Sequence, residues 1–223
     1  MGAMDIGAPM TGKDRPEYLA AADFIRENLR LQRVPAIPEI VLHRAHSGSG
    51  LGRLTSLDGA APYWAYHWAG GTVLARHILS QPQTVNGRRV LDLGSGSGLV
   101  AIAAVKAGAM HVTAVDVDAR AIAATDLNAA ANGVAIETLQ ADILGALPPI
   151  CDVILGGDVF YDARLASRVL PFLARCRAAS IDILIGDPGR ASFPREQFRL
   201  VGTHAVTDFG DAGADKVSGV YSL

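Results

Sequence analysis

The segment Val90-Leu91-Asp92-Leu93-Gly94-Ser95-Gly96-Ser97-Gly98-Leu99 decides the fold of this 223-residue chain. A short apolar run leads into three glycines, and an alanine-rich helical pattern over residues 99–107 follows them. Glycine permits a tight turn and lets a ligand approach the backbone without a Cβ in the way. The order strand, glycine turn, helix is typical of an open parallel sheet, in which ligands bind at the carboxyl ends of the strands.

The alternation of strand and helix continues to the end of the chain. Strands are expected at 89–93, 111–115, 136–140, 152–155 and 181–185, and helices at 99–107, 119–131 and 162–177. Two further strands, at 198–206 and 217–223, are separated by a Gly/Asp-rich turn without a long helix, so an antiparallel pair at one edge is expected. The pattern predicts a Rossmann-like α/β fold: a seven-stranded, mostly parallel sheet with helices on both faces and the last strand antiparallel.

The first part of the chain has a different character. Residues 1–87 are expected to form an N-terminal helical extension and aromatic lead-in, within the same domain as the core at 88–223. Helices are expected at 16–31, 38–45 and 71–79, and an aromatic stretch at 62–68 contains both tryptophans, Trp64 and Trp68. Half of all residues are hydrophobic and 19% are charged, which is enough apolar surface for a sizeable core.

Acidic residues recur at the carboxyl ends of the predicted strands. They are Asp92, Asp116, Asp142 and Asp158. A single such residue often caps the next helix, but four on one rim suit a positively charged ligand that carries a sugar. A dinucleotide site would have the spacing G-x-G-x-x-G, whereas this chain has G-x-G-x-G and an aspartate that would repel a pyrophosphate. The spacing therefore disfavours a nicotinamide oxidoreductase.

Together these residues resemble the class I S-adenosylmethionine-dependent methyltransferases. The resemblance implies that S-adenosyl-L-methionine is the cofactor and S-adenosyl-L-homocysteine the product. It implies a methionine site at the glycine turn, a ribose site at the second strand end and an adenine site at the third. The cofactor-binding residues expected on this basis are Trp68, Asp92, Gly94, Ser95, Gly96, Gly98, Asp116, Val117, Asp142, Ile143 and Asp158.

Residues 62–71, the Asp-x-x-Tyr motif at 158–161 and the segment 185–190 are similar to the electron transfer flavoprotein β-subunit lysine methyltransferases and their bacterial relatives. This resemblance implies methylation of lysine side chains of a protein, with that β subunit as a candidate. Asp158 and Tyr161 are then the catalytic candidates, Asp158 orienting the lysine nitrogen and Tyr161 lining its channel. Trp64, Tyr161 and Arg190 are the substrate-binding candidates, although both tryptophans fit packing roles equally well.

Other readings stay open. The cofactor half of the chain does not specify the acceptor, so methylation of a ribosomal protein (PrmA-like) or of a small molecule is the alternative. Residues 158–161 depart from the Asn-Pro-Pro-Tyr loop of the ribosomal type. The net charge of −2 predicts no nucleic-acid partner, and the scattered histidines and two cysteines predict no metal. No long apolar window or secretory signal is visible, so no membrane partner and a cytoplasmic location are expected.

Overall fold

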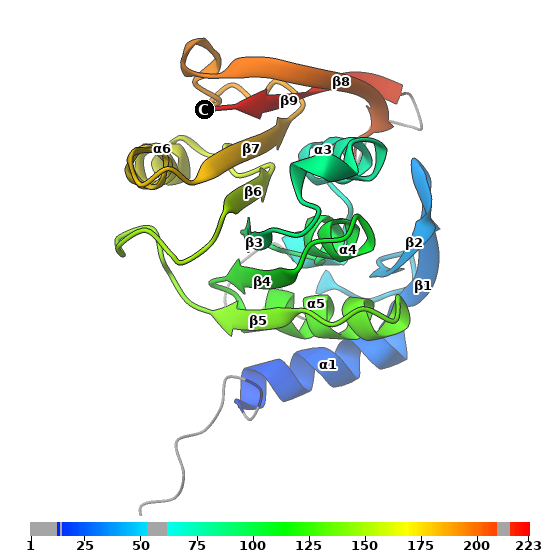
Figure 1. Cartoon of the computed structure of the whole chain (residues 1–223). Helices are drawn as coiled ribbons and strands as arrows, with labels where there is room; N and C mark the ends of the chain where they lie inside the picture. Colours follow the sequence, from blue (N-terminus) through cyan, green and yellow to red (C-terminus); the bar gives the residue numbers. More distant parts are fainter. Residues whose placement is uncertain (1–12, 14, 53–61, 209–214) are drawn as a thin grey trace, which may run out of the picture.

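The computed structural model describes residues 13, 15–52, 62–208 and 215–223. A mostly parallel sheet forms the centre of the molecule (Figure 1). Its strands are β3 (Arg89–Leu93), β4 (His111–Asp116), β5 (Glu137–Gln140), β6 (Val153–Gly157), β7 (Asp182–Asp187), β8 (Arg199–Thr207) and β9 (Asp215–Ser222). They lie in the order β5-β4-β3-β6-β7-β9-β8, and β9 is antiparallel to both of its neighbours. The predicted fold is confirmed; the Gly/Asp-rich turn falls largely at 209–214, outside the described residues.

Helices cover both faces of this sheet. On one face lie α3 (Ala69–Ser80), α4 (Leu99–Lys106) and α5 (Ala119–Ala131), and on the other lies α6 (Ala163–Ala178) (Figure 1). Successive strand residues point to opposite faces, so Val153 and Leu155 pack with the α3 side whereas Ile154 packs with the α6 side. Short 3₁₀ turns lie at Tyr63–Ala65, Pro82–Thr84 and Arg195–Gln197.

The N-terminal part corrects one prediction. A helix, α1 (Pro16–Asn28), forms as expected but ends before residue 31, and a hairpin of β1 (Arg30–Val34) and β2 (Ile37–Arg44) follows it. The helix expected at 38–45 is wrong. Ile40 and Leu42 are both fully buried against α4, and their spacing of two is the period of a strand, not of a helix.

Side chains of α5 hold the hairpin in place. Asn132 accepts a hydrogen bond from the backbone N–H of Val41 at 3.0 Å and donates one to its carbonyl at 2.7 Å. One turn earlier, Asn128 accepts from the N–H of His43 at 2.8 Å. These amides take the place of a neighbouring strand along the edge of β2, which is otherwise open to unwanted pairing. The helix α1 also packs on α5, with Ala21, Ala22 and Ile25 in the contact.

Candidate functional site

The glycine turn after β3 leaves an open backbone surface. Gly94, Gly96 and Gly98 all have positive φ, at 67°, 53° and 78°, in the left-handed region that favours glycine. A Cβ added to Gly98 would lie 2.9 Å from Cγ2 of Thr125, whereas a Cβ on Gly96 would meet nothing within 4 Å. Gly98 is therefore required by packing, and Gly96 faces free space that a ligand can enter.

The helix α5 holds the turn in this shape. The Thr125 hydroxyl lies 3.3 Å from the carbonyl oxygen of Gly96 and 3.3 Å from the hydroxyl of Ser95. The Asn128 amide donates to the carbonyl of Ser97 at 2.8 Å. Since Thr125 and Asn128 are fully buried, these hydrogen bonds hold the turn from a side that solvent does not reach.

Asp92 places a buried carboxyl under the turn. Its Oδ2 accepts a hydrogen bond from the N–H of Ala101, in the first turn of α4, at 3.0 Å. Only 1% of the side chain is exposed, and this burial raises the pKa of Asp92 to about 7. A cation beside this group would favour its charged form, so the site suits a positively charged ligand.

Asp116 joins the end of β4 to the turn. Its Oδ2 accepts from the N–H of Gly96 at 2.9 Å, and its Oδ1 accepts from the N–H of Asp118 at 3.0 Å. Burial raises its pKa. The next residue, Val117, is 64% exposed. The structure thus brings the expected ribose-binding acid directly against the glycine turn.

Asp142 and Ile143 follow β5, and no hydrogen bond among the described residues joins them to the glycine turn. The carboxylate of Asp142 accepts from Arg168 at 2.6 Å and from the N–H of Leu144 at 3.2 Å, and the bond from Arg168 lowers its pKa. Ile143 lines a pocket of about 320 Å³ beside β3 and β4, because residues 141–152 connect β5 to β6 without a helix. The adenine site at these two residues stays a prediction.

Asp158, directly after β6, is held in an unusual conformation. Its φ of 58° is rare for a residue other than glycine, and only 7% of it is exposed. Its Oδ2 accepts from the N–H of Gly70 at 2.6 Å, and its Oδ1 accepts from Nε of Arg190 at 2.7 Å. Burial raises the pKa of Asp158, and the hydrogen bond from Arg190 opposes that rise. The motif residue and the arginine, expected as separate contributors, form one ion pair.

Three glycines, Gly70, Gly157 and Gly186, allow the start of α3 to lie against Asp158. A Cβ on Gly70 would lie 2.4 Å from the carbonyl oxygen of Gly186, and one on Gly157 would lie 2.5 Å from the Cα of Gly71. The start of α3 therefore packs backbone to backbone on the ends of β6 and β7. Only residues without side chains allow this approach, which brings the N–H of Gly70 to Asp158.

Two further aspartates belong to this cluster, and the sequence analysis did not include them. Asp208, after β8, accepts from Nη2 of Arg190 at 3.2 Å and from the N–H of Ala69 at 3.2 Å. Asp187, at the end of β7, is fully buried and accepts from the N–H groups of Gly189 and Arg190, both at 2.7 Å. Burial raises the pKa of Asp187 to about 6. The strand-end rule that selected four aspartates would also have found these two.

The aromatic residues divide into two groups. Tyr63, Trp68 and Tyr161 form a chain of ring contacts, with centroids 5.5 Å apart for Tyr63 and Trp68 and 5.2 Å for Tyr63 and Tyr161. Tyr161 is 50% exposed, and burial of the rest, the neighbouring Tyr63 and the charge of Asp116 all raise its pKa. Trp64 is 2% exposed and packs between α1 and α5. The structure does not bring it to this group, which favours the packing alternative for Trp64.

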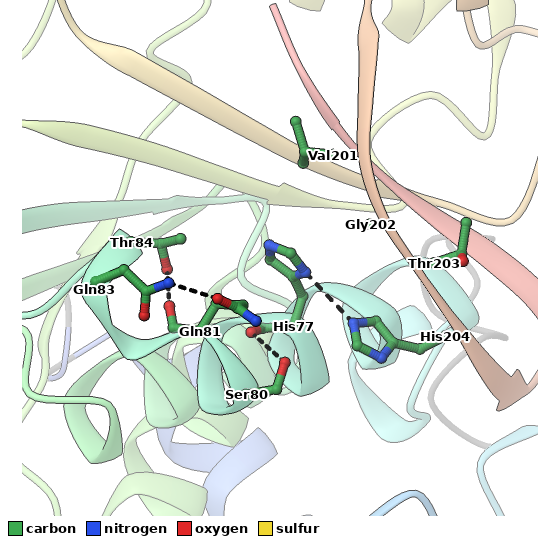
Figure 2. A pocket seen from close by; sticks show the side chains of 9 residues that line it. All are labelled: His77, Ser80, Gln81, Gln83, Thr84, Val201, Gly202, Thr203 and His204. Atoms are coloured by element: carbon green, nitrogen blue, oxygen red, sulfur yellow. Dashed lines mark hydrogen bonds between the residues drawn. The ribbon is translucent and has the colours of Figure 1, made fainter.

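A separate polar pocket of about 400 Å³ lies at the other end of α3. Figure 2 shows two of its lining residues, His77 and His204, turned toward one another. Nδ1 of His77 lies 3.4 Å from Nε2 of His204. His77 is seven residues beyond Gly70, or about 10 Å along the helix axis. This pocket is therefore distinct from the rim with the aspartates.

The described part of the chain shows neither a cluster of metal ligands nor a helix that could span a membrane. Within it, no three His, Cys, Asp or Glu side chains are grouped so that they could hold a metal ion. Within the same residues, the helices are too short or too polar to cross a membrane.

Comparison with known proteins agrees with this geometry. The ribosomal protein L11 methyltransferase family (PrmA) matches residues 71–156. The electron transfer flavoprotein beta subunit lysine methyltransferase of Danio rerio is 43% identical over 140 residues, covering 62% of this chain and 54% of that protein. The homologue from Caenorhabditis elegans is 29% identical over 202 residues, covering 82% and 83%. The matched part thus spans about half the length of the first of these relatives.

A solved structure shares the fold. The ribosomal protein L11 methylase of Lactobacillus delbrueckii subsp. bulgaricus superimposes with a TM-score of 0.51 at 22% identity, over 67% of this chain and 76% of that one. The sheet order and these matches make the chain similar to the class I S-adenosylmethionine-dependent methyltransferases. Within that class, it is similar to the electron transfer flavoprotein β-subunit lysine methyltransferases.

Proposed function

We propose that the chain is an S-adenosylmethionine-dependent protein-lysine N-methyltransferase, with the electron transfer flavoprotein β subunit as the candidate substrate. One observation carries the proposal: Asp116 ends β4 and Asp158 follows β6, and these strands are the two parallel neighbours of β3, so both carboxylates flank the glycine turn at the carboxyl ends of the strands. The segment 158–161, which we propose binds the acceptor, and Asp116, which we propose binds the cofactor, therefore lie on the same rim of the sheet. The sequence similarity to lysine methyltransferases supports the choice of acceptor.

The residues of the rim fit S-adenosylmethionine. A Cβ on Gly96 would occupy free space beside the backbone, as expected where a ligand lies against it. Asp92 would hold the cationic amino group, with the turn residues Gly94, Ser95, Gly96 and Gly98 around the methionine part. Asp116 and Val117 would hold the ribose, and Asp142 and Ile143 the adenine. Trp68 and Asp158 would border the same site from the start of α3 and the end of β6.

S-adenosylmethionine, when bound, would supply an electrophilic methyl group on its sulfonium. The lone pair of the lysine nitrogen would form the new N–C bond while the C–S bond broke, with its electron pair staying on sulfur. The displaced proton goes to solvent. The protein has to hold donor and acceptor in line, and such positioning can provide much of the rate enhancement. We assign the orientation of the lysine nitrogen to Asp158 and one wall of its channel to Tyr161.

Asp158→Asn tests this assignment. Asparagine tolerates positive φ and can still accept the bond from Gly70, so the fold should persist. Loss of one charge-assisted hydrogen bond, worth about 1.5–3 kcal/mol, should lower methyl transfer roughly tenfold to 150-fold. Binding of S-adenosylhomocysteine, measured by calorimetry, should change only a few-fold. Asp162→Asn is the matched control, because Asp162 is exposed and caps α6, and asparagine caps equally well.

Transfer of a labelled methyl group into a cell lysate, followed by assays on purified candidates, distinguishes the possible acceptors. Label on a lysine of the flavoprotein β subunit supports the proposal, whereas label on a ribosomal protein or in the small-molecule fraction supports the alternative. Transfer by Asp158→Asn equal to that of the parent chain would remove Asp158 from the mechanism.

Three other assignments belong to this proposal. We propose that residues 1–87 and 88–223 form one domain, since α1 packs on α5 and the hairpin on α4. A cytoplasmic location and the lack of a nucleic-acid, membrane or metal partner stay predictions from composition.

A further inference from the structure

Arg190 bridges two buried carboxylates at the start of α3. Its Nε donates to Asp158 at 2.7 Å, and its Nη2 lies 3.2 Å from Oδ2 of Asp208. Both carboxylate side chains are at most 10% exposed, against 29% for the arginine. Its own backbone N–H is held by Asp187 at 2.7 Å. Arg190 is thus held at its backbone by Asp187 and at its guanidinium by its two acidic partners.

The remaining oxygens of the same carboxylates bind the helix. Asp158 accepts the N–H of Gly70 at 2.6 Å through Oδ2, and Asp208 accepts the N–H of Ala69 at 3.2 Å through Oδ1. Each carboxylate therefore has one oxygen on α3 and the other on Arg190. The planar fork of a guanidinium can span two acceptors in this way, which the single ammonium of a lysine cannot do with the same geometry.

This arrangement bears on a chemical difficulty of lysine methylation. The acceptor nitrogen needs a free lone pair, yet the reference pKa of lysine is about 10.4. A nearby unpaired carboxylate would stabilise the ammonium form and make the difficulty worse. Asp158, the proposed orienting group, is not unpaired, because Arg190 places a positive charge 2.7 Å from its Oδ1.

We propose that Arg190 is a positioning residue that acts through Asp158. It keeps the carboxylate aimed at the acceptor nitrogen and offsets its charge, so that the acceptor lysine reaches the site as the free amine. The inference rests on the lysine methylation proposed above, and it gives Arg190 a role in the reaction without direct contact with the substrate.

None of the other charged groups described around Asp158 and Arg190 can offset the charge of Asp158 in place of Arg190. His67, just before α3, is neutral at pH 7 because burial lowers its pKa to about 4. The charged groups that act on the pair are Asp187 of β7 and Asp208, and His67 has Asp208 and Arg44 of β2 as its own charged neighbours. Both groups that act on the pair are acidic, so removing the guanidinium leaves excess negative charge at the rim.

The first test uses the unloaded protein and no substrate. The carboxyl carbon of Asp158 is titrated by ¹³C NMR in the parent chain and in Arg190→Gln. Since burial remains and the arginine is gone, the pKa of Asp158 should rise further in the variant. The control is Arg89→Gln, which removes another arginine–aspartate pair, with Asp152 at 2.6 Å, from the opposite end of the sheet. That variant should leave the titration of Asp158 unchanged, and an unchanged titration in Arg190→Gln would overturn the proposal.

The second test is the pH profile of kcat at a saturating concentration of a lysine acceptor, because kcat reports the ionisations of the enzyme–substrate complex. Arg190→Gln should move the acidic limb upward by about one pH unit, which is tenfold in rate at pH 7.5 and a much smaller loss at pH 9.5. Arg190→Lys should keep the profile of the parent chain at a lower rate, because the charge is retained and the fork is lost. A purely structural role would lower the rate equally at every pH, and that result would refute the inference.

The two proposals fail in different ways. A parent chain that transfers no methyl group to lysine at any pH disproves the proposed function. A parent chain that is active, together with an Arg190→Gln variant of unchanged pH profile, disproves the role of Arg190 alone. Calorimetry with S-adenosylhomocysteine should give affinities within a few-fold for the parent chain and each Arg190 variant.

Discussion

Replacing Gly98 with alanine should destabilise the fold much more than the same replacement at Gly96, although the two glycines have similar backbone conformations. Both glycines have positive φ, and alanine in the left-handed region costs about 1–2 kcal/mol. At Gly98 the new Cβ would lie 2.9 Å from Cγ2 and 3.1 Å from Cα of Thr125. Thr125 is fully buried and bonded to the turn, so it cannot move away freely. Such overpacking costs about 1–3 kcal/mol more.

The expected loss is therefore about 2–5 kcal/mol for Gly98→Ala and about 1–2 kcal/mol for Gly96→Ala. Domains are typically stable by about 5–15 kcal/mol, so both variants should fold. Urea unfolding measures the difference: at a slope of about 2 kcal/mol per molar urea, a gap of about 2 kcal/mol separates the midpoints by roughly 1 M.

The variant that loses less stability, Gly96→Ala, should nevertheless show a clear loss of affinity for the ligand. The Cβ on Gly96 points into space where a ligand would lie, so S-adenosylhomocysteine should bind roughly tenfold or more weakly, about 1.4 kcal/mol, despite the small loss of stability. Equal midpoints for the two variants would refute the packing argument at Gly98. Unchanged affinity in Gly96→Ala would show that the open surface there is not the cofactor cradle.

Two further predictions follow from Asp92 and from the hairpin. Burial raises the folded-state pKa of Asp92 from 3.8 to about 7, so the unloaded protein should lose up to about 4 kcal/mol of stability as pH rises from about 4 to above 7. Asp92→Asn should lack this loss in urea unfolding at pH 5 and pH 8 yet bind S-adenosylhomocysteine weakly; an identical pH dependence in the variant would count against the burial argument. Asn132→Ala removes two bonds to Val41 and should cost about 1–3 kcal/mol, with faster amide exchange in β2; protection equal to the parent chain would show that these bonds contribute little.

The core of the fold was predictable because its signals are local. The strand before Gly94, the glycine turn and the helix after Gly98 lie within one short segment, and their hydrophobic periods are unambiguous. Parallel strands place their carboxyl ends on one rim, so the sequence predicts that Asp92 and Asp116 lie near one another. In the structure Asp116 accepts the N–H of Gly96, in the turn that follows the strand of Asp92.

The hairpin and the Arg190 bridge were decided by tertiary structure. Nothing within residues 30–44 reveals that two asparagines of α5, about 90 residues later, complete the edge of β2. Likewise, Arg190 meets Asp158 across 32 positions, and Asp208 joins them from a third strand end. Local sequence determined which residues reach the rim of the sheet. Only the packing of α3 on β6 and β7, through side-chain-free glycines, decided which of them touch, because that packing depends on distances between elements that periodicity does not encode.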